Sequence, residues 1–238
     1  MTANLSSIPS RLSARGATLP PDPMPALLTS ASSRGSSAAR LASGLERLDA
    51  LVNNAGIGSG GGNAPRALSR DGIELRFAVN YLAPFVLTRA LLDLLKRSAP
   101  ARIVNVASAG QQALDFDDLM LERGYSGWRA YCQSKLAQIL FTFDLAAEMR
   151  GTGVTVNCLH PSSLMPTKMV MQAYGHSLST IEQGVEATAR LVTDPALDAV
   201  TGRYFDVLRE TRADPQAYDA AARAALRAVT ERMAGIGA

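Results

Sequence analysis

A tyrosine and a lysine stand four residues apart in the stretch AYCQSKLAQILFT, which runs from Ala130 to Thr142. The stretch is predicted to be helical, so Tyr131 and Lys135 would share one face of the helix. A lysine ammonium beside a phenol favours the phenolate, and we expect it to lower the pKa of Tyr131 from about 10 toward neutrality. A tyrosine tuned in this way is suited to general acid and base chemistry.

Polar residues also follow three apolar runs that are predicted to be strands. Asn53 and Asn54 follow the first run, Ser108 follows the second, and residues 160–163 follow the third. Ligands of parallel sheets bind beyond the carboxyl ends of the strands, so these polar groups would converge on one edge. Ser108 is suited to donate a hydrogen bond to a substrate carbonyl oxygen as negative charge develops there.

Each of these signals has an ordinary structural interpretation when it is taken alone. A Tyr-x-x-x-Lys pair occurs on solvated helices, asparagines after a strand form turns, and a serine caps the segment that follows it. The order of the signals is what favours an active site. Along the chain it runs NNAG (Asn53 to Gly56), Asn80, Ser108, Tyr131 and Lys135.

Apolar runs and helical periodicities alternate along the chain from about residue 46. Strands are predicted within residues 48–56, 101–108, 153–161 and 201–207, and helices within 72–97, 127–150, 179–191 and after 214. Continuously apolar strands that alternate with helices are typical of an α/β protein, with a parallel sheet covered by helices on both faces.

Composition and charge narrow the class of protein further. A chain of 238 residues that is 47% hydrophobic suits one globular domain. The sequence contains no run of 18 or more apolar residues, so we expect no membrane-spanning helix. Two histidines and two cysteines show no metal or disulfide spacing, so we expect no metal site and a reducing, cytoplasmic location. The net charge of +3 arises within residues 1–45, so the folded part has no basic face for nucleic acid.

From about residue 46 to the C-terminus, the sequence resembles the short-chain dehydrogenases/reductases (the SDR family). The motifs stand in the family's order, and the insert with DFDDL before AYCQSKLAQILFT is similar to the retinol-dehydrogenase-like branch. The resemblance implies a Rossmann-like domain over residues 46–238. It also implies an enzyme that transfers a hydride between NAD or NADP and a carbonyl or alcohol, and that forms a homodimer or homotetramer.

The resemblance further implies a role for each motif residue. Tyr131 would donate the proton in reduction, Lys135 would lower its pKa and bind the nicotinamide ribose, and Ser108 would orient the substrate oxygen. Asn80 would hold a water that links Lys135 to solvent. The cofactor-lining positions carried over from the family are Asn53, Ala55, Gly56, Tyr131, Lys135, Pro161 and Thr167, although Ser162 replaces the family's glycine after the proline.

Residues 165–179 are expected to form part of a mobile lid over this site. The segment contains Met165, Met169, Met171 and Tyr174, which would give an adaptable apolar surface, although such residues are more often part of a core. An apolar lid favours a hydrophobic small-molecule carbonyl or alcohol as the substrate.

The segment before residue 46 departs from the family's pattern. The glycine-rich turn that holds the pyrophosphate at a helix N-terminus does not occur before Asn53, so the N-terminal βαβ half of the fold is expected to be incomplete. We expect residues 1–45 to be irregular or disordered and to lie outside the family domain. Three interpretations are open: a targeting segment, a disordered tail, or translation of an unrelated reading frame, which the Ser- and Arg-rich composition favours.

This departure leaves two classes of function. The first is an NAD(P)-dependent oxidoreductase in which Tyr131 is the general acid and base and cofactor binding is impaired. The alternative is a catalytically silent, truncated remnant that cannot bind the dinucleotide and acts at most as a dimerising protein. A cofactor-dependent shift in thermal stability would separate the two.

Overall fold

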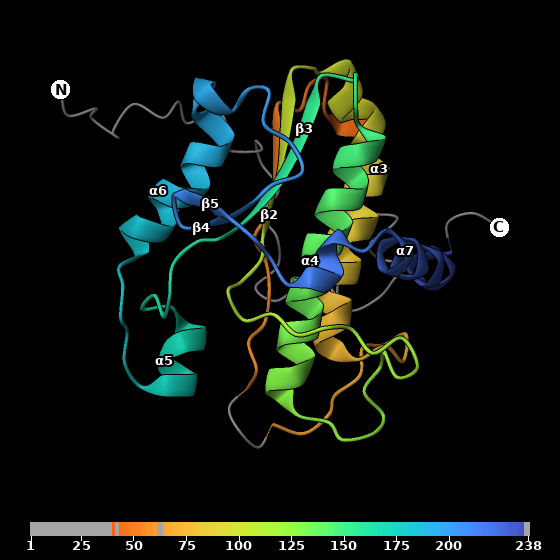
Figure 1. Ribbon diagram of the computed structural model, residues 1–238, viewed down its shortest axis with the longest axis vertical. Coiled ribbons are helices and arrows are strands. Elements are labelled where there is room, and N and C mark those ends of the chain that lie inside the picture. Colours follow the sequence, from red (N-terminus) through yellow and green to blue (C-terminus); the bar gives the residue numbers. More distant parts are fainter. Residues whose placement is uncertain (1–39, 41–42, 61–63, 236–238) are drawn as a thin grey trace.

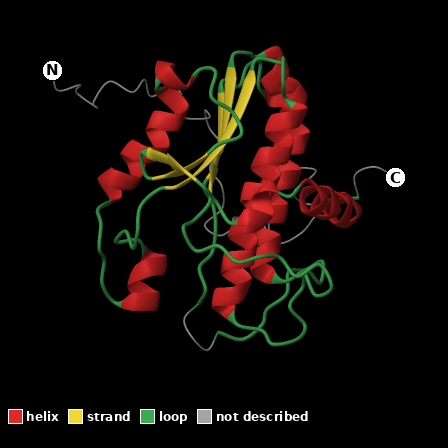
Figure 2. Cartoon of the chain, in the orientation of Figure 1, coloured by secondary structure: helices red, strands yellow, loops and turns green. Residues whose placement is uncertain are grey.

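The computed structural model describes residue 40, residues 43–60 and residues 64–235 (Figure 1). Most of the segment that we expect to be irregular, residues 1–45, lies outside these described residues. The described part of the chain forms a central sheet between two layers of helices, as Figure 2 shows. This arrangement is the α/β architecture that the alternation of apolar runs predicts.

The sheet has five strands in the order β1-β2-β3-β4-β5. Strands β1 to β4 pair in parallel, which confirms the predicted parallel sheet. The fifth strand was not predicted, and it turns back from β4 to pair antiparallel with it. The strands span Ala50–Asn53 (β1), Ala101–Val106 (β2), Val154–His160 (β3), Tyr204–Asp206 (β4) and Arg209–Thr211 (β5).

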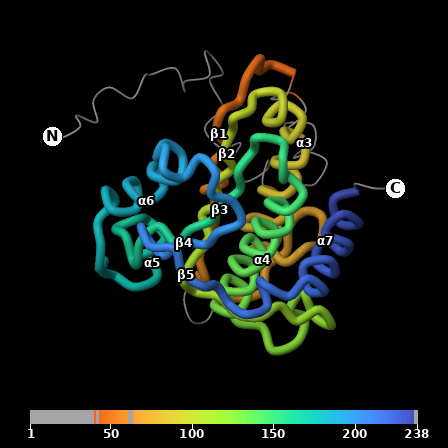
Figure 3. The backbone as a smooth tube through the Cα atoms, turned by 45° about the horizontal axis from the view of Figure 1, so that its top comes forward, coloured from red at the N-terminus to blue at the C-terminus, as the bar shows by residue number. Residues whose placement is uncertain are grey.

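Helices cover both faces of the sheet. On one face, α3 (Ala83–Arg97) and α4 (Gly127–Glu148) pack against the strands, and α7 (Ala220–Ala234) packs on the outside of α4. On the other face, α6 (Ile181–Thr193) packs against β2 and β3. Figure 3 shows α6 and the short helix α5 (Lys168–Tyr174) on the side opposite α3, α4 and α7.

Three short helices connect these elements. The π-helix η3 (Phe77–Leu82) runs directly into α3, while the 3-10 helices η4 (Pro195–Leu197) and η5 (Pro215–Tyr218) follow α6 and β5. Helix α5 was not predicted, because seven residues are too few to show a helical period. It lies within the segment that we expect to form a lid.

The continuous helix from Phe77 to Arg97 is apolar enough, by length and composition, to cross a membrane, with a mean hydropathy of 1.4. In the fold, 78% of this apolar stretch is buried, and its large side chains, including Tyr81, Phe85 and Leu95, form the centre of the main core. Core packing against α4 and the sheet therefore accounts for its hydrophobicity.

Among the described residues, strand β1 lies at one edge of the sheet. It pairs with β2, and its Val52 side chain is 39% exposed. An apolar strand with an open side is a template for pairing with another strand.

Candidate active site

A cleft of about 780 Å³ lies at the carboxyl ends of β1, β2 and β3. The loop that follows each of these strands contributes to it, as expected for a parallel sheet. Helix α4 forms a further wall, and helix α5 with the residues before it closes the cleft from the side of the predicted lid. The motif residues that line it are Ala55, Gly56, Ser108, Tyr131, Lys135, Pro161 and Thr167.

Helix α4 places Tyr131 and Lys135 in this cleft. The helix begins where the Ser126 side chain accepts a hydrogen bond from the backbone N–H of Arg129, which caps its first turn. Tyr131 lies one turn into the helix and is half-buried, while Lys135 lies one turn further along and is only 6% exposed. The Lys135 Nζ atom lies 5.9 Å from the centre of the Tyr131 ring.

The Lys135 ammonium is held by neutral acceptors. Its Nζ donates to the Val106 carbonyl oxygen at 2.7 Å and to Gln138 Oε1 at 3.1 Å. Burial lowers the pKa of Lys135 from 10.5 to about 8. The side chain is therefore mainly charged at neutral pH, and it loses that charge at mildly alkaline pH.

Burial raises the pKa of Tyr131, and a hydrogen bond with the Ser108 side chain offsets only part of this rise. The prediction that the pKa of Tyr131 lies near neutrality is therefore wrong, because burial is the largest influence on it and raises it. The positive charge near Tyr131 is visible in the sequence, whereas the loss of water around the phenol depends on the fold. A protonated Tyr131 at neutral pH is a proton donor.

Ser108 is fixed in place by its neighbours on the loop after β2. Its hydroxyl accepts a hydrogen bond from the Gly110 backbone N–H at 3.0 Å, and its carbonyl oxygen accepts one from the Tyr204 hydroxyl at 3.1 Å. A side chain added at Gly110 would lie 3.5 Å from the Ser108 hydroxyl and 3.1 Å from the Trp128 ring. The serine therefore presents its hydroxyl next to Tyr131 from a rigid loop.

Asn80 lies in the π-helix η3 and is fully buried. Its side chain holds the backbone of Ile57, accepting from the N–H at 2.8 Å and donating to the carbonyl oxygen at 3.0 Å. It also donates to the Ser134 hydroxyl at 2.9 Å. Asn80 thus connects the loop after β1 to helix α4, and π-helical turns of this kind are frequent at functional sites.

The side chain of Asn53 points into the core, away from the cleft. It donates to Thr88 Oγ1 at 3.0 Å and to Asn105 Oδ1 at 2.7 Å, and Asn105 in turn donates to Thr142 Oγ1 at 2.8 Å. This buried network joins β1 and β2 to helices α3 and α4. The residues of NNAG that line the cleft are the next three, from Asn54 to Gly56.

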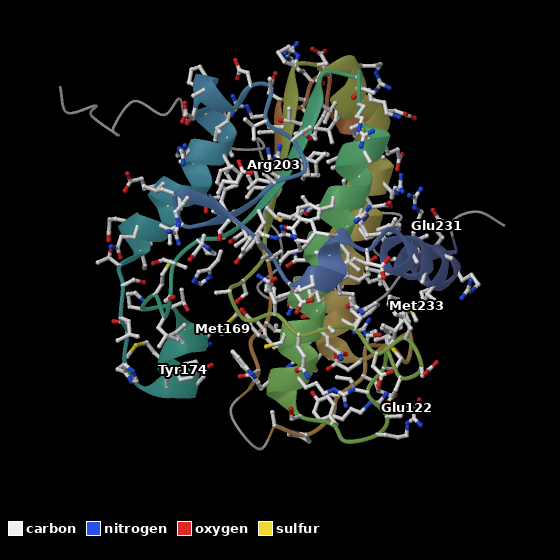
Figure 4. The ribbon with its side chains drawn as sticks, in the orientation of Figure 1. Glu122, Met169, Tyr174, Arg203, Glu231 and Met233 are labelled. Atoms are coloured by element: carbon white, nitrogen blue, oxygen red, sulfur yellow. The ribbon has the colours of Figure 1, made fainter. Side chains whose placement is uncertain are left out.

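The predicted lid lies against the loop after β1. Thr167 lines the cleft and caps α5, because its hydroxyl accepts from the Val170 N–H at 3.3 Å. Met169 projects from α5 toward that loop, and a side chain at Gly58 would come within 2.6 Å of Met169 Cγ (Figure 4). Tyr174, at the end of α5, is 45% exposed and also lines the cleft.

The cleft includes an aromatic residue, Trp128, that the sequence did not single out. Trp128 stacks on Tyr131 with ring centres 5.9 Å apart and an angle of 25° between the planes, and it is 51% exposed. It is the only tryptophan in the sequence, and its place one turn before Tyr131 was the available signal. His160 also lines the cleft; burial lowers its pKa, and its Nε2 lies 3.0 Å from Ser163 Oγ.

Within the described ranges, no group of three or more His, Cys, Asp or Glu side chains is arranged to hold a metal ion. Cys132 and Cys158 are both buried and free.

The fold and the site together define an α/β protein of the Rossmann type. The model of the short chain dehydrogenase family matches residues 22–177, and the chain belongs to this family. The matched stretch begins within the segment that we expect to lie outside the family domain.

Known proteins place the chain in the retinol-dehydrogenase-like branch of the family. Human Retinol dehydrogenase 13 is 37% identical over 218 residues, which cover 84% of this chain and 65% of the relative. Human Retinol dehydrogenase 14 is 38% identical over 207 residues, which cover 80% of this chain and 60% of that relative. The chain thus spans less than two thirds of the length of these curated relatives.

A solved structure of the same fold comes from chicken. The crystal structure of NADPH-bound carbonyl reductase from chicken fatty liver has a TM-score of 0.57 and 26% sequence identity. The matched region covers 79% of this chain and 75% of the reductase.

Proposed function

We propose that the chain is an oxidoreductase that interconverts a carbonyl and an alcohol, with Tyr131 as the general acid and base. The observation that carries this proposal is the placement of Ser108, Tyr131 and Lys135 around one largely apolar cleft. Family membership and the names of the two human relatives support it, and they make a retinoid alcohol or aldehyde the first substrate to test.

The chain's own residues fit the nicotinamide and ribose end of a dinucleotide. An ammonium group has three N–H donors, and Lys135 uses two of them within the protein, which leaves one for a ribose hydroxyl. Gly56 has no side chain, and one added there would lie 3.7 Å from Lys135 Nζ, so the glycine keeps this approach open. When bound, NADH or NADPH supplies the hydride that reduces a carbonyl carbon.

In the direction of reduction, the protein residues act on the substrate oxygen. Tyr131, which is protonated at neutral pH, donates its proton to the carbonyl oxygen. The Ser108 hydroxyl stabilises the negative charge that develops on that oxygen. The phenolate left behind is stabilised by the Lys135 ammonium on the same helix face. Alcohol oxidation follows these proton movements in reverse.

Apolar side chains line the same cleft and favour a hydrophobic substrate, which would displace water from it on binding. Trp128 covers one side of the Tyr131 ring, and Met169 and Tyr174 approach from α5. Removing water strengthens the electrostatic interactions of the developing charge with Ser108 and Lys135.

The proposal is tested by following the oxidation of NADH and NADPH with a series of aldehydes of increasing apolar size. We expect turnover that rises with apolar size and falls by about a hundredfold in Ser108→Ala, the typical effect of removing one donor to a developing oxyanion. Tyr218→Phe is the control, because Tyr218 contacts Arg212 and Phe143 outside the cleft. Equal turnover in Ser108→Ala and in the unaltered chain would contradict the proposal.

A further inference from the structure

Glu74 and Arg76 form a buried ion pair immediately before the π-helix η3. They are 1% and 6% exposed, and Arg76 Nη1 lies 3.5 Å from Glu74 Oε1. The attraction within a buried pair is largely offset by the loss of hydration of both charges, so the pair adds little to stability. The position of the guanidinium offers a functional reason for it.

The remaining donors of Arg76 hold two segments that are far apart in the sequence. Nε donates to the Gly58 carbonyl oxygen at 2.9 Å, and Nη2 donates to the Ser59 carbonyl oxygen at 2.6 Å. Nη1 donates to the Tyr125 hydroxyl at 2.5 Å, two residues before helix α4. The planar fork of an arginine can make these contacts at once, whereas the single ammonium of a lysine cannot.

Two glycines make room for this arrangement. A side chain at Gly60 would lie 2.7 Å from Arg76 Nη2, and the backbone of Gly60 has a positive φ of 75°. A side chain at Gly127, the first residue of α4, would lie 2.0 Å from the Ser59 carbonyl oxygen. The loop after β1, the guanidinium and the start of α4 are therefore in direct contact.

One of the segments that Arg76 joins lines the cleft, and the other leads directly into the helix that lines it. The loop from Asn54 to Ser59 lines it on the side of β1, and α4 carries Tyr131 and Lys135. Asn80 holds Ile57 of this loop, while Arg76 holds the two residues that follow. We propose that Arg76 is a positioning residue, which fixes the loop after β1 against the start of the helix that carries Tyr131. Its effect on turnover rests on the proposed function.

Two single variants separate this role from simple charge balance. Glu74→Gln keeps the arginine fork and removes the negative charge, whereas Arg76→Lys keeps both charges and removes the fork. If Arg76 positions the loop, Arg76→Lys loosens the loop and lowers turnover, while Glu74→Gln lowers overall stability but leaves the contacts of Arg76 with Gly58 and Ser59 in place. If the pair only balances charge in the core, Arg76→Lys is mild and Glu74→Gln is harmful, because an unpaired buried charge remains.

The first readout does not need turnover. The Ile57 amide is hydrogen-bonded to Asn80, so its hydrogen exchange reports on the loop, and acrylamide quenching of Trp128 reports on the start of α4. In Arg76→Lys we expect Ile57 exchange to accelerate about tenfold or more, the effect of losing one hydrogen bond to a charged group. Quenching of Trp128 should increase, while exchange in β2 and β3 stays unchanged.

The second readout is the kinetic constants of the reaction. We expect kcat/KM to fall about tenfold in Arg76→Lys and to change less than about twofold in Glu74→Gln. If the unaltered chain shows no turnover, the proposed function fails while amide exchange still decides the role of Arg76. If Arg76→Lys does not fold, the neutral double variant Glu74→Gln/Arg76→Met replaces it, with the same accelerated Ile57 exchange expected. Unchanged Ile57 exchange in the folded variant overturns the proposal.

Discussion

Replacing Lys135 with methionine tests the electrostatics of the site without requiring turnover. Lys135 is 6% exposed, and among the described residues its ammonium forms no ion pair with a carboxylate. Its two acceptors, the Val106 carbonyl oxygen and Gln138 Oε1, are neutral. The folded protein therefore holds a buried charge that burial disfavours. Methionine is of similar length and carries no charge, so the variant removes that burden.

The size of this destabilisation follows from the pKa of Lys135, which burial lowers from 10.5 to about 8. Between these two values the unfolded chain binds more protons at this lysine than the folded chain, so stability rises with pH. At about 1.36 kcal/mol for each pH unit, the buried charge destabilises the fold by about 3 kcal/mol below pH 8, and this penalty vanishes near pH 10.5.

Urea unfolding of both chains at pH 7 and pH 10.5 measures this effect. We expect the stability of the unaltered chain relative to Lys135→Met to increase by about 3 kcal/mol between the two pH values. Losing the hydrogen bonds to Val106 and Gln138 lowers the stability of the variant equally at both pH values, so it cancels in the comparison. Lys96→Met is the matched control, since Lys96 is 39% exposed. A difference that does not change with pH would refute the reasoning.

Three further predictions follow from the same geometry. Gly127→Ala should destabilise the fold by about 1–3 kcal/mol in urea unfolding, because the added Cβ would lie 2.0 Å from the Ser59 carbonyl oxygen. This clash outweighs the preference of alanine for helices. An unchanged urea midpoint would contradict the prediction. The kcat/KM for carbonyl reduction should fall as pH rises through the pKa of Lys135 at about 8, and a flat profile would argue against its role beside Tyr131. Calorimetry should show that the 238-residue chain binds NADH or NADPH no better than about millimolar, because the sequence before Asn53 lacks the glycine-rich turn expected to donate two or three hydrogen bonds to the pyrophosphate. Micromolar affinity would show that this interpretation of the segment is wrong.

The order of the main elements was predictable from the sequence. The long helices around Asn80 and Tyr131 show a clear helical period, and the strands before Asn53 and Ser108 are continuously apolar. Because the ends of parallel strands meet at one edge, the convergence of Ser108, Tyr131 and Lys135 followed from the order of elements alone. Helix α5 and strand β5 were missed because each is too short to show a period.

Side-chain direction and burial were not readable in the same way. An apolar run does not indicate which face of the sheet its last polar residue takes, so Asn53 was expected at the cofactor although its side chain lies in the core. The pKa of Tyr131 depends on burial, which only the fold determines. Arg76 lies within an apolar-faced helical stretch, and its contacts with Gly58 and Ser59 join segments that no local pattern connects.

The central claim is that Tyr131 transfers the proton in a hydride-transfer reaction, and deuterium transfer tests it most directly. The chain is incubated with an apolar aldehyde and with NADPH or NADH that carries two deuterium atoms at the reactive carbon, and the alcohol product is analysed by mass spectrometry. We predict one deuterium in the product formed by the unaltered chain. No product should form with Tyr131→Phe, which keeps the ring and its stacking on Trp128 but lacks the hydroxyl. Deuterated alcohol formed at the same rate by a folded Tyr131→Phe variant would contradict the account.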